Sequence, residues 1–105
     1  MKQNILKAAR VIRSKNAGPF EFTFDIIFKS KKYFQHFKEK KIINKGLIKK
    51  LFKIESSDIL NIIYFEPSMA VKITIKRPVT SGAPGDSDIY GAQQHAPLLE
   101  IEFEM

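Results

Sequence analysis

An unbroken alternation in residues 20–28, FEFTFDIIF, constrains the fold of this chain more than any other feature. Large apolar side chains stand at every second position, and mostly polar ones lie between them. A period of two is typical of a β-strand, so five large apolar side chains share one face and require a core against it. Asp25 falls on the opposite face in mid-strand. It either faces solvent, which is the commoner case, or directs a carboxylate at a site.

Residues 30–53 predict two short amphipathic helices, or one helix broken near Ile43 and Asn44. Ser30 and Asn44 are residue types that cap helix N-termini. The apolar residues after each cap recur at helical spacing, and they are Tyr33, Phe34, Phe37, Leu47, Ile48, Leu51 and Phe52. We expect this stripe to be core rather than a ligand pocket. We also expect the helical lysines to point away from the sheet and His36 to be exposed.

Three further strands are predicted downstream. Residues 58–65 are almost continuously apolar, residues 70–76 alternate, and Glu66–Met69 joins them as a hairpin. Leu98–Glu104 alternates again and gives a final strand. The pattern is weaker before residue 20: Asn4–Ile12 fits a short helix or an irregular lead-in strand. RSKNAGP, residues 13–19, is predicted to be a turn because Asn, Gly and Pro lie within four residues.

The order strand, helices, strand, strand, loop, strand predicts an α+β fold of the ferredoxin-like split βαβ type. We expect a four-stranded antiparallel sheet with helices on one face, in which the long loop Ser81–Pro97 largely replaces the second helix. In this layout the strands at 20–28 and 70–76 are antiparallel neighbours. The loop would therefore leave the sheet next to RSKN.

Composition limits the remaining possibilities. A length of 105 residues predicts one domain, and the absence of cysteine excludes disulfides, zinc–thiolate sites and thiol nucleophiles. No apolar run is long enough for a secretory or membrane-spanning segment, so we expect a soluble cytoplasmic protein. Residues 1–53 hold 15 of the 18 Lys and Arg residues and three of the 11 acids. We interpret this asymmetry first as a solvated lysine-rich face, and only second as a polyanion site.

The loop Ser81–Pro97 carries polar residue types typical of a site. A polar segment of this length between apolar segments is usually functional or disordered, and we favour function. It lacks the Walker A and dinucleotide-binding motifs, although its glycines could form an anion-binding nest. Asp86, Asp88 and Gly91 match the start of an EF-hand loop, but Pro97 stands where a bidentate Glu is required. We therefore predict no metal and no cofactor.

Two groups of candidate site residues follow. His95, with Asp86 and Asp88 within ten residues, fits a general base oriented by a carboxylate, although a lone histidine in a polar loop is more often structural. The candidate ligand-binding residues are Arg13, Ser14, Lys15, Asn16, Tyr90, Gln93 and Gln94. Arg13 and Lys15 would bind an anionic group such as a carboxylate or phosphate. No consensus for RNA recognition occurs in residues 70–76, so we expect no specific nucleic-acid binding.

Two long segments resemble the signatures of a bacterial and archaeal family, domain-of-unknown-function family 4387. They are RSKNAGPFEFTFDIIF (13–28) and GDSDIYGAQQHAPLLEIE (85–102), and the resemblance extends through YFEPSMAVKITIKRPVTSG between them. The family is associated with AtuA-type proteins of acyclic terpene utilisation. The resemblance implies a larger AtuA-like partner that works on branched carboxylates or their CoA thioesters, and a ferredoxin-like fold. It carries no established catalytic residues.

We therefore expect a small accessory subunit or binding module that contributes RSKN and GDSDIYGAQQH to an anion or ligand site. One alternative is a stand-alone enzyme with His95 as base and an aspartate orienting it. Another is a module that binds polyanions through the lysine-rich helices, with a binding affinity that depends steeply on salt. Self-association into a homo-oligomer is a further expectation, and membrane association is not.

Overall fold

The computed structural model describes residues 2–16, 20–76 and 96–105, with the side chains of Lys15 and Asn16 excepted. Its elements, in chain order, are β1 (Lys2–Asn4), η1 (Ile5–Lys7), β2 (Ala9–Asn16), β3 (Glu21–Phe28), α1 (Lys31–Lys40), α2 (Lys45–Phe52), η2 (Ser56–Asp58), β4 (Ile59–Phe65), η3 (Glu66–Ser68), β5 (Ala70–Lys76), η4 (Ala96–Glu100) and β6 (Glu102–Glu104). The η elements are short 3-10 helices of three to five residues.

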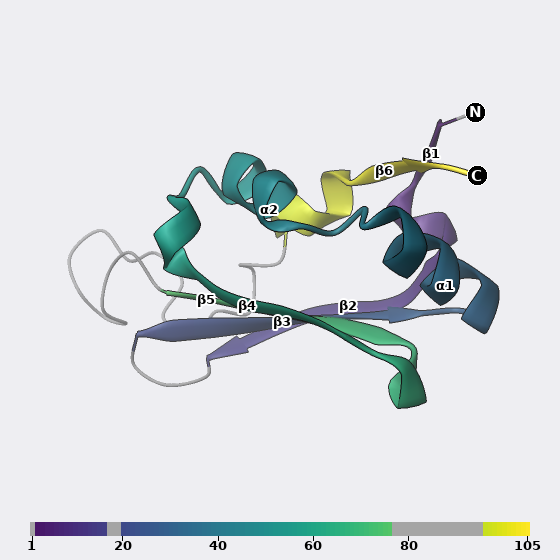
Figure 1. Cartoon of the computed structure of the whole chain (residues 1–105), viewed down its shortest axis with the longest axis horizontal. Helices are drawn as coiled ribbons and strands as arrows, with labels where there is room; N and C mark the ends of the chain where they lie inside the picture. The colour runs from purple at the N-terminus through teal and green to yellow at the C-terminus, as the bar shows by residue number, and fades with distance from the viewer. Residues whose placement is uncertain (1, 17–19, 77–95) are drawn as a thin grey trace.

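The α+β class and the four-stranded antiparallel sheet are confirmed. The sheet has the strand order β2-β3-β5-β4, and every neighbouring pair is antiparallel. The helices α1 and α2 and the short pair β1–β6 all lie on one side of it (Figure 1). The β4–β5 hairpin is confirmed, and so is the pairing of β3 with β5, in which Lys76 lies opposite Glu21.

The prediction of a turn at RSKN is wrong, because Arg13–Asn16 is the second half of strand β2. This strand pairs with β3 from Ala9 opposite Phe28 to Asn16 opposite Phe22, with one register shift between Ala9 and Val11. The polar residues Arg13–Asn16 lack the alternation that predicts a strand. Their pairing with β3 makes this segment a strand. Strand β2 nevertheless ends, at Asn16, at the same end of the sheet where β5 ends at Lys76, as the strand order predicted.

The predicted position of the last strand is also wrong. Only Glu102–Glu104 is strand, and it pairs with β1 in a separate two-stranded sheet. The place beside β3 that a ferredoxin-like order gives to the last strand is held by β2. Residues 96–100 form a short 3-10 helix that buries Leu98 and leaves Leu99 exposed, which breaks the predicted alternation. Ile101, directly after it, is buried.

Local capping explains where the helices begin and end. The Ser30 side chain accepts a hydrogen bond from the amide of Tyr33, and the Asn44 side chain accepts one from the amide of Leu47, so both predicted N-caps are confirmed. Each helix ends at a lysine, Lys41 or Lys53, in the left-handed backbone region. In this conformation the lysine N–H bonds a carbonyl of the last helical turn, and the chain then turns away from the helix axis.

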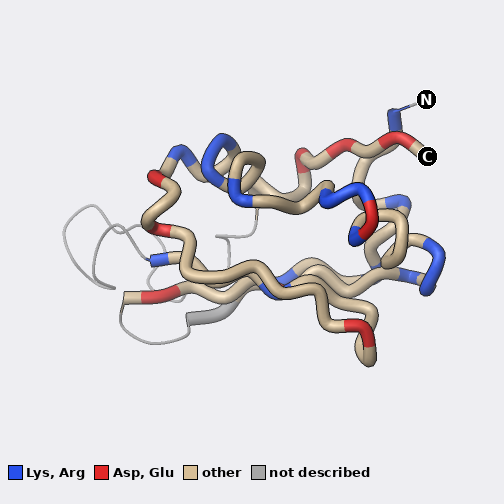
Figure 2. The backbone as a smooth tube through the Cα atoms, in the orientation of Figure 1, with Lys and Arg blue, Asp and Glu red and all other residues tan. Residues whose placement is uncertain are grey.

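The core lies between the sheet and the helices. One face of β3 supplies Phe22, Phe24, Ile26 and Phe28, all buried, and the helices cover it with the buried Phe34, Phe37 and Ile48. The helical lysines are exposed, as expected, and Figure 2 shows their blue segments along the helical layer. Within the described residues, no helix has the length and apolarity that crossing a membrane requires.

Candidate functional site

The face of the sheet that points away from the helices carries an ordered set of side chains, and we call it the open face. Strand register aligns Arg13, Asp25 and Lys72 across β2, β3 and β5, with Ile63 of β4 completing the row. The next row places Ile27 between Val11 and Ala70, and Phe65 lies beyond Ala70. Facing residues of neighbouring strands lie close together, so a charged row runs directly beside an apolar one.

Asp25 is the centre of the charged row and is only 6% exposed. The Arg13 guanidinium donates from Nε to Asp25 Oδ2 over 3.2 Å, and the rest of Arg13 is largely exposed. Lys72 stands opposite Asp25 on the other side and forms no ion pair with any described residue. Two cations therefore flank one carboxylate, which leaves the row with an excess positive charge.

A hollow of about 340 Å³ opens over this row. Its charged floor is Arg13, Asp25 and Lys72, and its remaining lining is Ile27, Ile63, Phe65, Ser68 and Ala70. Ile63 and Phe65 are half exposed, so an apolar wall faces solvent beside the cationic groups of Arg13 and Lys72. This arrangement suits an amphiphilic anion, with the anionic group between Arg13 and Lys72 and an apolar chain against the wall.

The structure brings together only part of the predicted site. Arg13 lies at the hollow, whereas Ser14 pairs with Phe24 and so belongs to the helical face of β2. Lys15 and Asn16 occupy the end of β2, opposite Thr23 and Phe22. The other predicted residues, which are Asp86, Asp88, Tyr90, Gln93, Gln94 and His95, lie outside the described residues.

Sequence reasoning left Asp25 open and missed Lys72 and the apolar wall. Lys72 shares one face of its strand with Thr74 and Lys76, and these three polar residues alternate with Val71, Ile73 and Ile75, which is the ordinary pattern of a strand with one solvated face. A signal was nevertheless present in Ile27, Ile63 and Phe65, because they are apolar residues on strand faces that do not belong to the core. Only the registers of β3 with β5 and of β5 with β4 show that these residues lie together.

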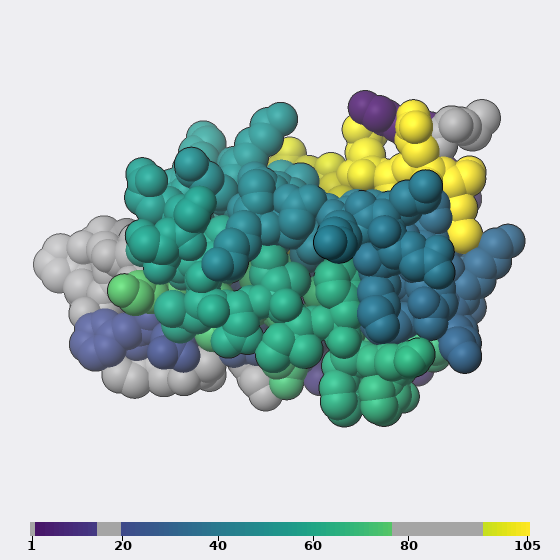
Figure 3. Space-filling view, viewed as in Figure 1, coloured from purple at the N-terminus to yellow at the C-terminus, as the bar shows by residue number. Residues whose placement is uncertain are grey.

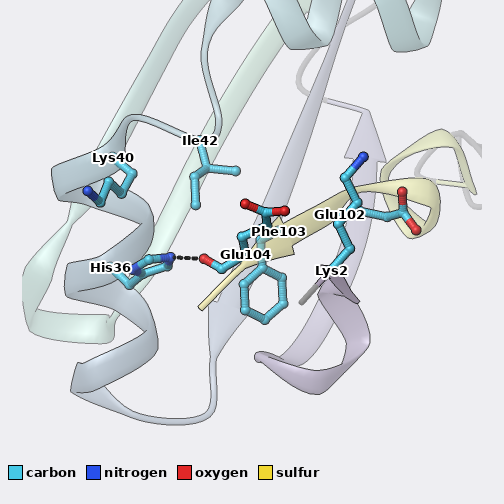
Figure 4. Close-up of a pocket in the computed structure, with 7 residues that line it drawn as sticks. All are labelled: Lys2, His36, Lys40, Ile42, Glu102, Phe103 and Glu104. Atoms are coloured by element: carbon cyan, nitrogen blue, oxygen red, sulfur yellow. Dashed lines mark hydrogen bonds between the residues drawn. The ribbon is translucent and has the colours of Figure 1, made fainter.

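A second hollow lies where α1 meets the end of the chain (Figure 4). It measures about 410 Å³ and is lined by Lys2, His36, Lys40, Ile42, Glu102, Phe103 and Glu104. His36 Nε2 lies 2.6 Å from the backbone oxygen of Glu104, and a carbonyl only accepts, so this nitrogen carries the proton. His36 is half-buried and fastens β6 to α1, so the expectation of an exposed histidine is wrong.

The described residues contain no group of three His, Cys, Asp or Glu side chains placed to hold a metal ion. An antiparallel sheet covered on one face, with a cationic and apolar hollow on the other, defines a small α+β protein with a candidate site for an anionic ligand. A protein-family model, Domain of unknown function (DUF4387), matches residues 5–102, and the chain belongs to this family. Searches of curated proteins and of solved structures found no match.

Proposed function

We propose that this chain is an accessory binding module that holds a branched carboxylate in the open-face hollow. The observation that carries the proposal is the contact between the two rows: Arg13 and Lys72 supply positive charge where Ile63 and Phe65 supply apolar surface. A branched carboxylate has both halves of the matching chemistry. Asp25 sets the position of the Arg13 side chain through their hydrogen bond.

The resemblance to AtuA-associated proteins supports the same substrate class and gives the module its context. In this proposal the chain works with a larger AtuA-like protein in carboxylate or acyl-CoA catabolism. A free acid fits the cationic row directly. In a CoA thioester the carboxyl charge is lost, and the CoA phosphates would have to meet Arg13 and Lys72 instead.

Part of the chain supports the comparison with ferredoxin-like proteins. From β3 through the helices to β4 and β5 the chain follows a split βαβ course, with β5 between β3 and β4. In this proposal the partner docks against the open face of the sheet, whose side chains contact the ligand. Purification of the chain together with an AtuA-type protein tests the partnership, and a chain that stays free beside it contradicts it.

The ligand site is tested by an NMR titration of amide shifts with 3-methylbutanoate. Inorganic phosphate, which has charge and no apolar chain, and 3-methylbutanol, which has the chain and no charge, are the controls. We expect shifts centred on Asp25 and Lys72 and tighter binding of 3-methylbutanoate than of either control. Equal binding of all three, or shifts spread over the helices, would refute the site.

Single substitutions distinguish a direct contact between Lys72 and the ligand from a general effect of net charge. Lys72→Met should raise the Kd for 3-methylbutanoate about tenfold, because a hydrogen bond to a charged group is worth about 1.5–3 kcal/mol. Lys76→Met is the matched control, since Lys76 lies in the same strand and on the same face but outside the hollow. If both variants lower affinity equally, net charge rather than the Arg13–Lys72 site binds the ligand.

The exposed helical lysines support one alternative, a module that binds polyanions. They are Lys31, Lys32, Lys38, Lys40, Lys41, Lys45, Lys49, Lys50 and Lys53. Titration with single-stranded DNA at several salt concentrations tests it, because release of counterions gives a steep dependence of log affinity on log salt. A flat dependence would remove this alternative.

A further inference from the structure

The outer edge of β4 differs from the opposite edge of the same sheet. β4 spans seven residues, ILNIIYF, without a single charge, and Leu60, Ile63 and Phe65 are 39%, 49% and 52% exposed. The other edge strand, β2, carries Arg10, Arg13 and Lys15. Proteins usually protect exposed edge strands with charges, prolines, bulges or a covering element. β4 has one register shift, between Ile59 and Asn61, and contains no charge and no proline.

The outer edge of β4 pairs with no described strand. Within the described residues it is the last strand of the sheet order, next to β5 alone. In the space-filling view its green surface faces the viewer below the helices (Figure 3). A strand at a sheet edge presents backbone N–H and C=O groups that another extended chain can pair with.

The two sides of this edge offer different side-chain environments. On the helical side, a hollow of about 450 Å³ is lined by Ile43, Asn44, Ile62 and Tyr64 and by three lysines, Lys38, Lys41 and Lys45. On the open side, the exposed neighbours are Ile63 and Phe65. Successive side chains of an added strand point to opposite faces, so alternate residues would meet lysines and apolar surface.

We propose that β4 is the docking edge for an extended acidic segment of another protein. The segment adds an antiparallel or parallel strand to β4, with acidic side chains directed at the lysine hollow and apolar side chains beside Ile63 and Phe65. Charge complementarity identifies the occupant. A second copy of this chain has a net charge of +7, and its own β4 contains no acid to place against these lysines.

The docking edge does not depend on the ligand site proposed above. Lys41 and Lys45 lie on the helical side of the sheet, whereas Arg13 and Lys72 lie on the open face. Variants of one pair can therefore be scored against the ligand of the other. Failure of one proposal leaves the other measurable on the same protein.

The probe is an acetylated seven-residue peptide that alternates Glu with Val, titrated into the full chain and followed by NMR. We expect amide shifts and slowed hydrogen exchange in Ile59–Phe65, because an added strand protects outward-facing amides. A peptide that alternates Lys with Val is the matched control and should bind at least tenfold more weakly. Equal binding of the two peptides, or no protection in β4, would overturn the proposal.

Two pairs of variants locate the contact. Lys41→Glu with Lys45→Glu should weaken binding of the Glu–Val peptide at least tenfold and leave binding of 3-methylbutanoate unchanged. Lys31→Glu with Lys32→Glu makes the same change in net charge at the start of α1, outside the lysine hollow, and should change peptide affinity less than twofold. Equal losses in the two double variants would show general charge attraction and overturn the docking edge.

A second pair tests the strand itself. Leu60→Lys puts a charge on β4, where it disfavours strand addition, and Leu6→Lys makes the same substitution at an exposed leucine of η1. We expect at least a tenfold loss only for Leu60→Lys. Light scattering that finds a dimer of the chain dispersed by Leu60→Lys would overturn the proposal in favour of a second copy. Single-stranded DNA that protects β4 as the peptide does would overturn it in favour of a polyanion.

Discussion

Tyr64 fastens strand β4 to the connection between the two helices, and its removal gives the sharpest test of the packing. Its hydroxyl accepts a hydrogen bond from the Ile43 amide at 3.0 Å and donates one to the Ile43 carbonyl at 2.8 Å. Ile43 is 1% exposed, so its two backbone groups depend on this hydroxyl rather than on solvent. The substitution Tyr64→Phe removes both bonds and keeps the ring.

We expect Tyr64→Phe to lower the free energy of unfolding by about 2 kcal/mol, since each net hydrogen bond contributes about 1 kcal/mol and a buried group left unpaired costs more. For a domain near 100 residues this corresponds to a fall in Tm of roughly 10 °C. Urea unfolding gives the free energy directly, and the amide of Ile43 should exchange faster. Tyr33→Phe is the control, because it removes the same hydroxyl from a tyrosine whose ring packs edge-on against Phe103.

The same hydroxyl predicts a response to alkaline pH. Burial raises the pKa of Tyr64 above its usual value, and the hydrogen bond to the backbone of Ile43 partly opposes that shift. A raised pKa in the folded state means that the protonated form is favoured there. The contribution of Tyr64 is therefore complete below about pH 10, the pKa of an unfolded tyrosine, and is lost as pH rises through the higher folded value.

The stability difference between the natural chain and Tyr64→Phe should accordingly shrink above about pH 10. A loss below about 0.5 kcal/mol at neutral pH would show that water replaces the hydroxyl at Ile43. A stability difference that stays constant up to alkaline unfolding would refute the assignment of the raised pKa to burial.

Three further predictions concern other parts of the chain. Lys53→Gly should raise the free energy of unfolding by about 1 kcal/mol, because Lys53 has φ 56° at the end of α2, and Lys49→Gly inside the helix should lower it by about as much. Asn44→Ala should cost about 1 kcal/mol in urea unfolding through loss of the N-cap, and Asn44→Asp should restore most of it. Asp25→Asn should cost about 1 kcal/mol, because its partner Arg13 is 61% exposed. The Asn side chain keeps an oxygen that can accept from Arg13 Nε and loses the negative charge that repels an anion, so binding of 3-methylbutanoate should tighten. Weaker binding in Asp25→Asn would contradict the proposed ligand position.

Local patterns predicted the elements that local physics determines. The alternation of β3 from Phe22 to Phe28, the caps Ser30 and Asn44 and the β4–β5 hairpin all follow from short stretches of sequence, and all are confirmed. Phe20, predicted to share the core face, lies before β3 and is 58% exposed. The first half of β2 falls within Asn4–Ile12, for which a lead-in strand was one of two alternatives. The second half was missed because RSKN has the composition of a turn, and its pairing with β3 makes it a strand. The last strand was misplaced because β2 occupies the edge beside β3.

The candidate site shows the same division. Arg13 was predicted to bind an anion from its charge, and Asp25 was recognised as a carboxylate in mid-strand. Lys72 was missed because the register of three strands creates its row. Arg13 and Asp25 are 12 residues apart in the sequence, and Asp25 and Lys72 are 47 residues apart. A shift of one residue in either pairing would turn the partner side chain to the other face, so register carries information that composition lacks.

The one-sided covering of the sheet makes the open face separable from stability. Burial of Phe24, Ile26 and Phe28 against the helices stabilises the fold through the other face of the same strand. Arg13 and Lys72 are exposed and contribute little to that core, so the fold itself does not require them there. Because surface substitutions usually change stability by less than about 0.5 kcal/mol, loss of ligand binding in Lys72→Met would report on the site and not on folding. Function is therefore expected on the open face, where the residues can change without unfolding the chain.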